Sequence, residues 1–197
     1  MAAIQSKVGT DLIEDLPIKF TAVAANIAAE KEHWFQSGPI DQAIRASVSL
    51  PLFFAPYNVG GVQLIDGGIL NPTPIEPTLG DDTDLTLAVD LGGPMMKEAI
   101  PEPEKAQSPW QQKMDDFLDS MKSSESKPKD QWDMFYIADQ SFNTMQKALA
   151  RIRMADNPPD HLISVPRNKC GTLEFDRSAE MIEYGYRLAA EQLSSKI

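Results

Sequence analysis

Apolar residues in the first third of the chain occur in short runs that predict β-strands. Ile18–Ala25 alternates in character and contains β-branched and aromatic residues, so it is expected to form a buried strand with His33–Phe35 as its short partner. Phe53–Tyr57 and Val62–Ile65 flank Gly60-Gly61, a glycine pair typical of a hairpin turn. This part of the sequence therefore predicts two pairs of strands.

Two later apolar runs also predict strands. Leu85–Leu91 is continuous and leads into Gly92-Gly93, as expected for a central strand that is buried on both faces. His161–Pro166 is expected to be the last strand. Because these strands alternate with helical segments, the pattern indicates an α/β layered fold.

Three segments have the apolar spacing or the start and stop residues that are typical of helices. Pro39–Ser47 is predicted as a short helix capped by Ser37 and stopped by Pro51. Two longer helices are predicted, one over Gln131–Met154 and one over Arg177–Ser195. Asp176 is expected to cap the second of them. The side chains expected to face inward are Trp132, Phe135, Phe142, Met145, Leu149 and Ile152 in the first and Met181, Ile182, Leu188 and Leu193 in the second.

The segment from about residue 94 to 157 differs from the rest and is expected to be a helical, partly mobile insertion. Pro94–Gln107 is rich in proline and charge and predicts a loop, while Trp110–Met121 repeats apolar residues at helical spacing. Ser123–Asp130 is polar throughout. The helices fit either ordinary packing or a lipid-contacting lid, and ordinary packing is the favoured interpretation.

Composition narrows the classes of partner. The chain has 197 residues, enough for one domain, and a formal net charge of −11 with a pI near 4.6, which disfavours nucleic acid and anionic lipid. The one cysteine, Cys170, excludes an internal disulfide and fits a reducing compartment. No run is apolar enough to span a bilayer, and Met1–Thr10 lacks a signal-peptide core. A cytoplasmic location is expected, with peripheral membrane contact through a local patch left open.

The most informative segment is Leu64–Pro74, in which two apolar residues lead into Asp66 and two glycines, Gly67 and Gly68, follow it. This pattern places a carboxylate at the end of a buried strand, on a turn that a ligand or another backbone can approach closely. By itself an Asp-Gly-Gly turn is more often structural than functional.

Several ordered blocks around this turn change its interpretation. In this order the blocks resemble the bacterial patatin-like phospholipases, lipid acyl hydrolases related to plant patatin and to the catalytic domain of neuropathy target esterase. The matching blocks are Pro17–Ala25, Gly38–Pro56, Leu64–Pro74 and Leu85–Leu91, with a weaker likeness through Ser108-Pro109-Trp110, Arg151–Asp160 and the C-terminal helix.

The resemblance implies a three-layer α/β/α fold, of which residues 1–197 would be the C-terminal portion of a single domain without its N-terminal, nucleophile-bearing part. Patatin-like enzymes use a Ser-Asp dyad. Asp66 matches the acid and would act as the base, with Gly67 and Gly68 shaping the site. The family's serine lies in a Gly-x-Ser-x-Gly motif, and this chain contains no such motif.

The implied activity of the intact protein is carboxylic ester hydrolysis of a phospholipid, lysophospholipid or other acyl ester, without a cofactor or a metal. This chain alone is expected to be inactive, and to associate with itself or with a serine-bearing N-terminal segment. Two alternatives remain at this point: a catalytically silent interaction or regulatory protein that keeps the scaffold, and one half of a split enzyme.

Other polar residues are interpreted as structural. Ser47 and Ser49 lack a glycine elbow and are expected to cap a helix or to pack. Arg45 is expected either to pair with a carboxylate near the site or to lie on the surface, and the sequence favours neither. His33 and His161 lack the context of a Ser-His-Asp triad. The last candidates are Asn71, expected to bond local backbone, and Asp81-Asp82-Thr83-Asp84, expected to be a solvated loop rather than a cation site.

Overall fold

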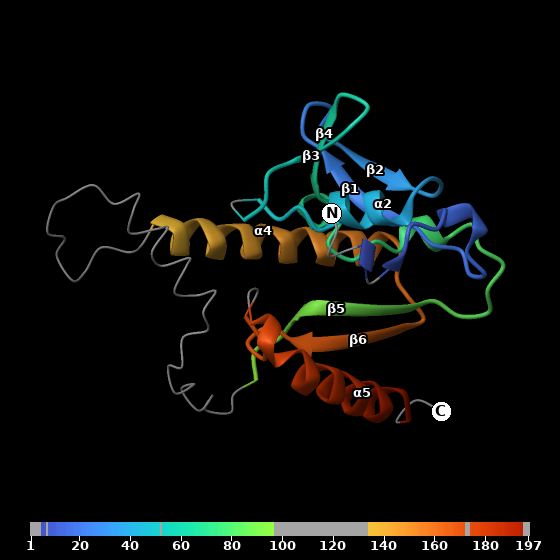
Figure 1. Cartoon of the computed structure of the whole chain (residues 1–197). Helices are drawn as coiled ribbons and strands as arrows, with labels where there is room; N and C mark the ends of the chain where they lie inside the picture. The colour runs from blue at the N-terminus through green and yellow to red at the C-terminus, as the bar shows by residue number, and fades with distance from the viewer. Residues whose placement is uncertain (1–4, 7, 52, 97–133, 172–173, 195–197) are drawn as a thin grey trace, which may run out of the picture.

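A four-stranded antiparallel sheet organises the first part of the chain. The computed structural model describes residues 5–6, 8–51, 53–96, 134–171 and 174–194 (Figure 1). The sheet has the order β2-β1-β4-β3, so β1 and β4 are its inner strands. Its strands are β1 (Ala22–Asn26), β2 (Lys31–Phe35), β3 (Tyr57–Val59) and β4 (Val62–Asp66), which follow a short 3-10 helix, η1 (Ile13–Asp15).

The strand register sets the two faces of this sheet. Ala24 of β1 lies opposite His33 on one side and opposite Asp66 on the other. Paired residues in an antiparallel sheet project to the same face, so these three side chains share one face and their sequence neighbours share the other. The inner strand β1 is buried from Ala22 to Ala25, as expected for a strand covered on both sides.

Helix α2 (Ile40–Ser47) packs against β1 and β4 through two alanines, Ala43 and Ala46, that are fully buried. Small side chains at these positions let the helix come close to the sheet and fill the core around Leu64. The prediction that Ser37 caps this helix is wrong. Pro39 is the N-cap, with no side-chain bond, and the backbone N–H of Ile40 donates instead to the carbonyl of Asp11.

The hairpin between β3 and β4 is confirmed, with Gly60 and Gly61 at φ values of 57° and 88°. Two expected strand limits are wrong. Ile18 is 78% exposed and precedes β1, which begins only at Ala22, and Phe53 and Phe54 lie in an exposed turn rather than in a strand. Aromatic and β-branched composition therefore overstated the length of both strands.

A second sheet consists of two parallel strands, β5 (Leu87–Gly93) and β6 (His161–Pro166). The predicted limits of β6 are confirmed. The prediction that the Leu85–Leu91 run is buried on both faces is wrong for the described residues, because Leu87, Val89 and Leu91 are 44%, 48% and 71% exposed while Ala88 between them is buried. One face of β5 is thus covered and the other is open.

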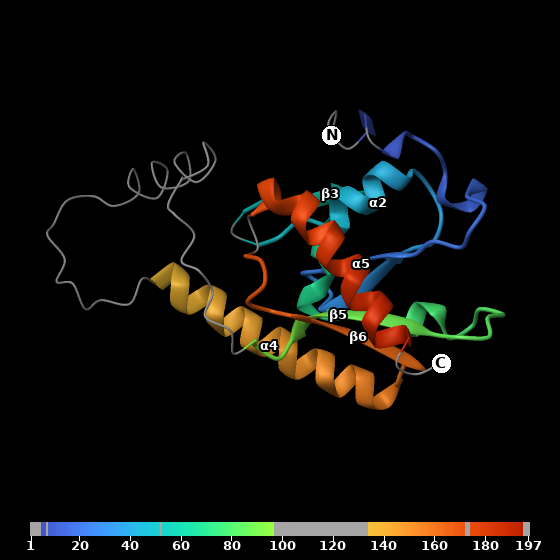
Figure 2. The ribbon, with the colours of Figure 1, turned by 90° about the horizontal axis from the view of Figure 1, so that it is seen from below.

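Two longer helices flank the second sheet. Helix α4 (Met134–Asp156) runs between the two sheets in Figure 1, and α5 (Ser178–Ser194) crosses the β5–β6 pair in Figure 2. A short 3-10 helix, η4 (Phe175–Arg177), precedes α5, so Asp176 lies inside a helical turn rather than at a cap. The expected inward position of Ile182 is wrong, since this side chain is 74% exposed.

The buried face of α4 also differs from the prediction. Met145 and Ile152 are 63% and 59% exposed, whereas Ala150 is buried and Arg153 is half-buried. The helix is therefore oriented by polar partners on its inner side as well as by apolar packing. The predicted helix Trp110–Met121 and the polar stretch Ser123–Asp130 lie outside the described residues.

Helices and strands alternate along the chain, and helices cover sheet faces, so the expectation of an α/β fold is confirmed. Among the helices that the structure describes, none has the length and apolar character needed to cross a bilayer.

Candidate active site

Asp66 is the last residue of β4, as the sequence predicts, and it begins a tight turn. Its carboxylate Oδ1 accepts a hydrogen bond of 2.7 Å from the backbone N–H of Gly68, and its own N–H donates to the carbonyl of Ser49 at 3.0 Å. Burial raises the pKa of Asp66 above the ordinary value, and the bond from Gly68 opposes this rise. The carboxylate is therefore both oriented and partly desolvated.

Gly67 and Gly68 are required by the space around this turn. A Cβ atom on Gly67 would lie 2.2 Å from the backbone carbonyl oxygen of Val23 in the neighbouring strand, a distance that no side chain tolerates. A Cβ atom on Gly68 would lie 2.9 Å from the Asp66 carboxylate and 3.0 Å from the side-chain amide nitrogen of Gln146 on α4. The two glycines thus permit close approach of β1 and of α4 to the acid.

The far end of the turn is fixed by its backbone. Residues 67–69 form a 3-10 helix, η2 (Gly67–Ile69), and the carbonyl of Gly67 accepts hydrogen bonds from the N–H groups of Leu70, at 3.0 Å, and Asn71, at 2.9 Å. Asn71 is 2% exposed. The expectation that its side chain bonds local backbone is wrong in the described structure, because the side-chain amide nitrogen donates to two carboxylates outside its own turn.

The side chain of Asn71 joins a part-buried cluster of charges that the sequence does not indicate. Its amide nitrogen donates to Glu76, in η3 (Glu76–Thr78), at 2.8 Å and to Glu32 of β2 at 3.2 Å. Arg153 of α4 forms ion pairs of 2.7 Å with Glu32 and 3.1 Å with Glu76, and also donates to the carbonyl of Leu70 at 3.3 Å. The cluster ties α4, the edge strand β2 and the end of the Asp66 turn together.

The protonation states in this cluster follow from its contacts. Burial alone would raise the pKa of Glu76, but hydrogen bonds from Asn71, from the backbone and from Arg153 outweigh burial and hold the pKa below the ordinary carboxyl value. Burial also acts to lower the pKa of Arg153, and the two carboxylates reverse that effect. Glu76 is thus stabilised as an anion and Arg153 as a cation.

The serines near the turn show no feature of a nucleophile. Ser49 is fully buried, and its hydroxyl donates to the Arg45 carbonyl at 2.8 Å and accepts from the Arg45 guanidinium at 2.6 Å. Ser47 ends α2. The Arg45 guanidinium lies 5.4 Å from the ring centre of Phe54 and 5.7 Å from that of Tyr57, so its interactions are with rings and a hydroxyl.

The structure does not bring either histidine to Asp66. The register puts buried Ala24 between His33 and Asp66, and His33 packs edge-on against Phe35 with ring centres 4.4 Å apart. His161 begins β6 in the other sheet, and its Nδ1 is buried without a partner in the described residues. Both residues fit the structural interpretation.

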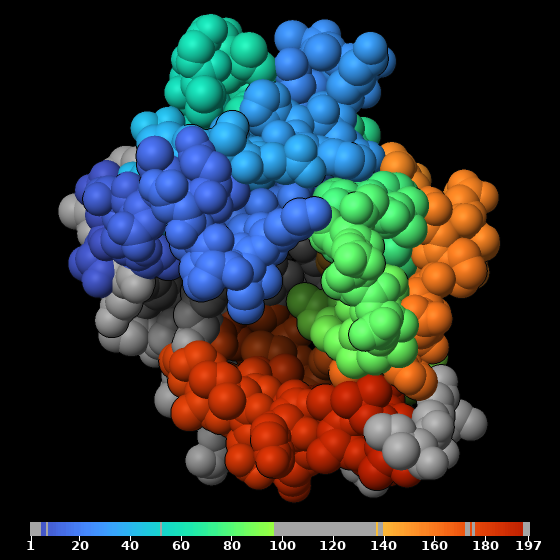
Figure 3. All heavy atoms as spheres, turned by 90° about the vertical axis from the view of Figure 1, so that its right-hand side faces the viewer, coloured from blue at the N-terminus to red at the C-terminus, as the bar shows by residue number. Residues whose placement is uncertain are grey.

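The acidic run at residues 81–84 is likewise separate from Asp66. Asp81 forms an ion pair of 2.7 Å with Lys19, and no group of His, Cys, Asp or Glu within the described part of the chain is arranged to hold a metal ion. A cavity of about 500 Å³ lies beside this ion pair and does not include Asp66. In Figure 3 the blue N-terminal segment touches the green segment around residue 81, and the surface is hollowed below that contact.

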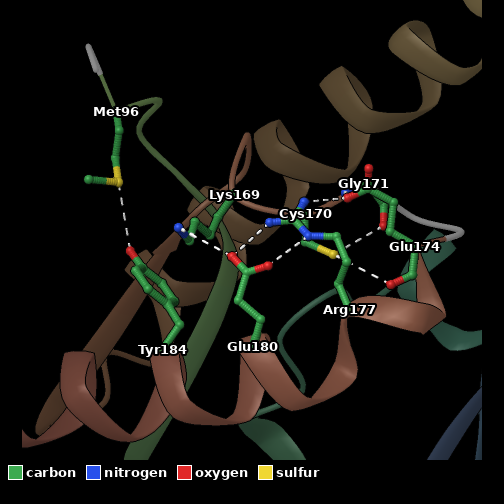
Figure 4. A network of polar contacts seen from close by, with 8 residues as sticks. All are labelled: Met96, Lys169, Cys170, Gly171, Glu174, Arg177, Glu180 and Tyr184. Carbon is green, nitrogen blue, oxygen red and sulfur yellow. Dashed lines mark hydrogen bonds and ion pairs between the residues drawn. The ribbon is translucent and has the colours of Figure 1, made fainter. Parts of the chain in front are cut away.

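A second polar network surrounds Cys170, at the start of α5 (Figure 4). Arg177 bridges Glu174 at 2.7 Å and Glu180 at 2.8 Å, and Lys169 lies 4.8 Å from the ring centre of Tyr184. Burial, together with the hydrogen bonding and charge of Glu174, raises the pKa of the Cys170 thiol. The thiol is therefore less ionised than an ordinary cysteine and is poorly suited to act as a nucleophile.

Comparison with known proteins identifies the family of this chain. Residues 3–79 match the family model for patatin-like phospholipase, a range that includes Asp66 and both glycines. An uncharacterised NTE family protein of Mycobacterium tuberculosis is 33% identical over 98% of this chain and 68% of its own length. A lysophospholipase NTE1 of Pyricularia oryzae is 26% identical over 94% of this chain but only 12% of its own length. The chain belongs to the patatin-like phospholipase family, with NTE family proteins among its relatives.

Proposed function

We propose that this chain supplies the acid half of a serine lipid acyl hydrolase, with Asp66 as the base of a Ser-Asp dyad. The observation that carries the proposal is the carboxylate at the end of β4, oriented by Gly68 and partly desolvated. A carboxylate with a raised pKa accepts a proton more readily than an exposed one. The proposal assigns the serine to a Gly-x-Ser-x-Gly segment, a motif that these 197 residues do not contain.

The hydrogen bond from Gly68 supports a proposed division of roles between the two carboxylate oxygens. Oδ1 accepts the Gly68 N–H, and we propose that Oδ2 receives the proton of the serine hydroxyl. The serine oxygen attacks the acyl carbonyl, and the alcohol leaves with the proton that Asp66 returns. Water then adds to the acyl-enzyme, again giving its proton to Asp66, and the serine oxygen takes that proton back from Asp66 as the bond to the acyl group breaks and the fatty acid is released.

The substrate class comes from the relatives. The fungal relatives are named lysophospholipases, and the matching family is named for phospholipases. We therefore propose a lysophospholipid, phospholipid or related acyl ester as substrate, hydrolysed in the cytoplasm or at a membrane surface that faces it. The exposed side chains of Leu87, Val89 and Leu91 on β5 favour association with the serine-bearing segment, which would remove apolar area from water.

Labelling with a fluorophosphonate probe tests where the nucleophile lies, because the probe bonds to an activated serine without turnover. The 197-residue chain should remain unlabelled. The native polypeptide as its cell makes it, or this chain supplied with a Gly-x-Ser-x-Gly segment, should be labelled at that serine and should hydrolyse lysophosphatidylcholine.

Two results would count against the proposal. Labelling at Ser47 or Ser49 in the isolated chain would place the nucleophile within these residues. Failure of the native polypeptide to label or to hydrolyse any acyl ester, despite a folded Asp66 turn, would favour a catalytically silent protein on the same scaffold.

A further inference from the structure

We infer that Arg153 is a positioning residue that holds the Asp66 carboxylate in place through the far end of its turn. The inference rests on the proposed role of Asp66 as a base. Arg153 lies on α4 and does not touch Asp66 in the contacts described above. Its influence passes through Leu70, Asn71 and Glu76.

The contacts of Arg153 converge on one end of the turn. One guanidinium nitrogen, Nη2, donates to Glu32 at 2.7 Å and to the backbone carbonyl of Leu70 at 3.3 Å. The other, Nη1, donates to Glu76 at 3.1 Å, and the second oxygen of Glu76 accepts from Asn71 at 2.8 Å. Arg153 therefore holds Leu70 directly and Asn71 through Glu76.

Leu70 and Asn71 pass this constraint to the acid. Both donate their backbone N–H groups to the carbonyl of Gly67, the residue that follows Asp66. Gly67 is also held from the other side, where it packs against the carbonyl of Val23. The turn thus has one anchor in β1 and a second anchor in the Arg153 cluster.

A second anchor matters because the turn contains two successive glycines. Glycine has more backbone freedom than any other residue, so Gly67 and Gly68 do not hold a conformation by themselves. The N–H of Gly68 must point at the Asp66 carboxylate to orient it. Loss of the anchor at Leu70 and Asn71 would let this N–H move away.

Arginine is suited to this position and lysine is not. The side chain of Arg153 donates three hydrogen bonds in this cluster, two to carboxylates and one to a backbone carbonyl. The planar fork of a guanidinium provides that geometry, whereas an ammonium group is a single point of charge. Arg153→Lys is therefore a substitution that keeps the charge and loses the geometry.

Amide hydrogen exchange of the Gly68 N–H, measured by NMR on the ¹⁵N-labelled chain, tests the inference without requiring activity. The chain contains an internal reference, since Gly92 donates its N–H to Oδ1 of Asp90 at 2.8 Å, the same two-residue spacing, at the irregularity within β5. It also contains a matched control, Arg151, which is exposed on the same helix two residues earlier. The variants are Arg153→Lys, Arg153→Met and Arg151→Met.

In both Arg153 variants the Gly68 N–H should exchange about tenfold faster relative to the Gly92 N–H. The reason is that the hydrogen bond from Gly68 to Asp66 weakens when Arg153 no longer holds the far end of the turn. Arg151→Met should leave the ratio unchanged. An unchanged ratio in Arg153→Lys and Arg153→Met would overturn the inference, and so would an equal acceleration at Gly68 and Gly92, which would mean that Arg153 only stabilises the fold.

Ester hydrolysis, measured on this chain supplied with a Gly-x-Ser-x-Gly segment, separates this inference from the proposed function. Arg153→Lys should lower kcat with little change in KM, since it disturbs the base and not the binding of substrate. If Asp66→Asn leaves activity intact, the proposed function fails. If Asp66→Asn abolishes activity while Arg153→Lys leaves both kcat and the Gly68 ratio unchanged, only the positioning role fails.

Discussion

Arg153 and Glu32 are separated by 121 positions in the sequence, yet the guanidinium of one and the carboxylate of the other lie 2.7 Å apart. This contact fastens α4 to the edge strand of the four-stranded sheet, next to the turn that begins at Asp66. It explains why the inner side of α4 presents Gln146 and Arg153 while Met145 and Ile152 are exposed.

Asn71→Asp should destabilise the fold by about 2–4 kcal/mol, because it places a third carboxylate at a buried position beside Glu32 and Glu76, whose described cationic partner is Arg153. Urea unfolding followed by circular dichroism measures the effect. Asn58→Asp is the matched control, since Asn58 is exposed and its Oδ1 accepts from Gly61, a bond that aspartate can also accept. Equal stability of the two variants would contradict the description of the cluster.

Gly67→Ala should be among the most destabilising single substitutions in the chain, costing about 3 kcal/mol or more, because its Cβ would meet the Val23 carbonyl oxygen at 2.2 Å. Gly80→Ala serves as the control, since nothing lies within 4 Å of a Cβ at that position. Thermal unfolding of both variants makes the comparison. A Gly67→Ala variant as stable as Gly80→Ala would show that β1 and the turn are not in close contact.

Asp66→Asn should raise the stability of the fold at neutral pH. Burial raises the folded-state pKa of Asp66, so the folded protein binds more protons than the unfolded chain between the unfolded and the folded pKa values. Stability contributed by this group therefore falls as pH rises through that window and stays lower above it. Asparagine removes the charge and keeps an oxygen to accept from Gly68.

The difference between Asp66→Asn and the parent chain in urea unfolding should be present at pH 7 and should vanish at a pH below the unfolded pKa. A variant less stable than the parent at pH 7 would contradict the assigned cause of the shift.

These site predictions show how far the sequence alone could lead. The apolar run into Asp66 and the two glycines after it predict the acid at a strand end, because strand and turn propensities are local. The limits of β6 follow for the same reason. The Arg153 cluster has no local signature, since its members are brought together only by the packing of distant elements.

The sequence also fails to predict which faces of α4 and β5 are buried, for a related reason. Apolar spacing in α4 favoured Met145 and Ile152, but buried polar partners turned the helix toward Arg153. A continuous apolar run in β5 favoured burial on both sides, but in the described structure a helix covers only part of the pair that it forms with β6. In both cases tertiary contacts overrode the local pattern.

Cys170 should be alkylated by iodoacetamide more slowly than a free cysteine at pH 8, because burial and Glu174 raise the pKa of its thiol and so reduce the thiolate fraction. Glu174→Gln should move the midpoint of the pH–rate curve for alkylation to lower pH. Glu183→Gln, on the exposed side of α5, should leave the midpoint unchanged. A midpoint that is the same in the parent chain and in Glu174→Gln would contradict the role of Glu174.

The proposed role of Asp66 as the catalytic base is tested most directly by comparing Asp66→Asn with Asp90→Asn in the chain supplied with a Gly-x-Ser-x-Gly segment. Asp90 is a matched control because its Oδ1 likewise accepts the N–H of the glycine two residues later, Gly92, in the other sheet. Hydrolysis of a short-chain p-nitrophenyl ester should fall by about 10²–10⁴-fold in Asp66→Asn and stay within a few-fold of the parent in Asp90→Asn. Activity retained in Asp66→Asn, or lost equally in both variants, would contradict the claim.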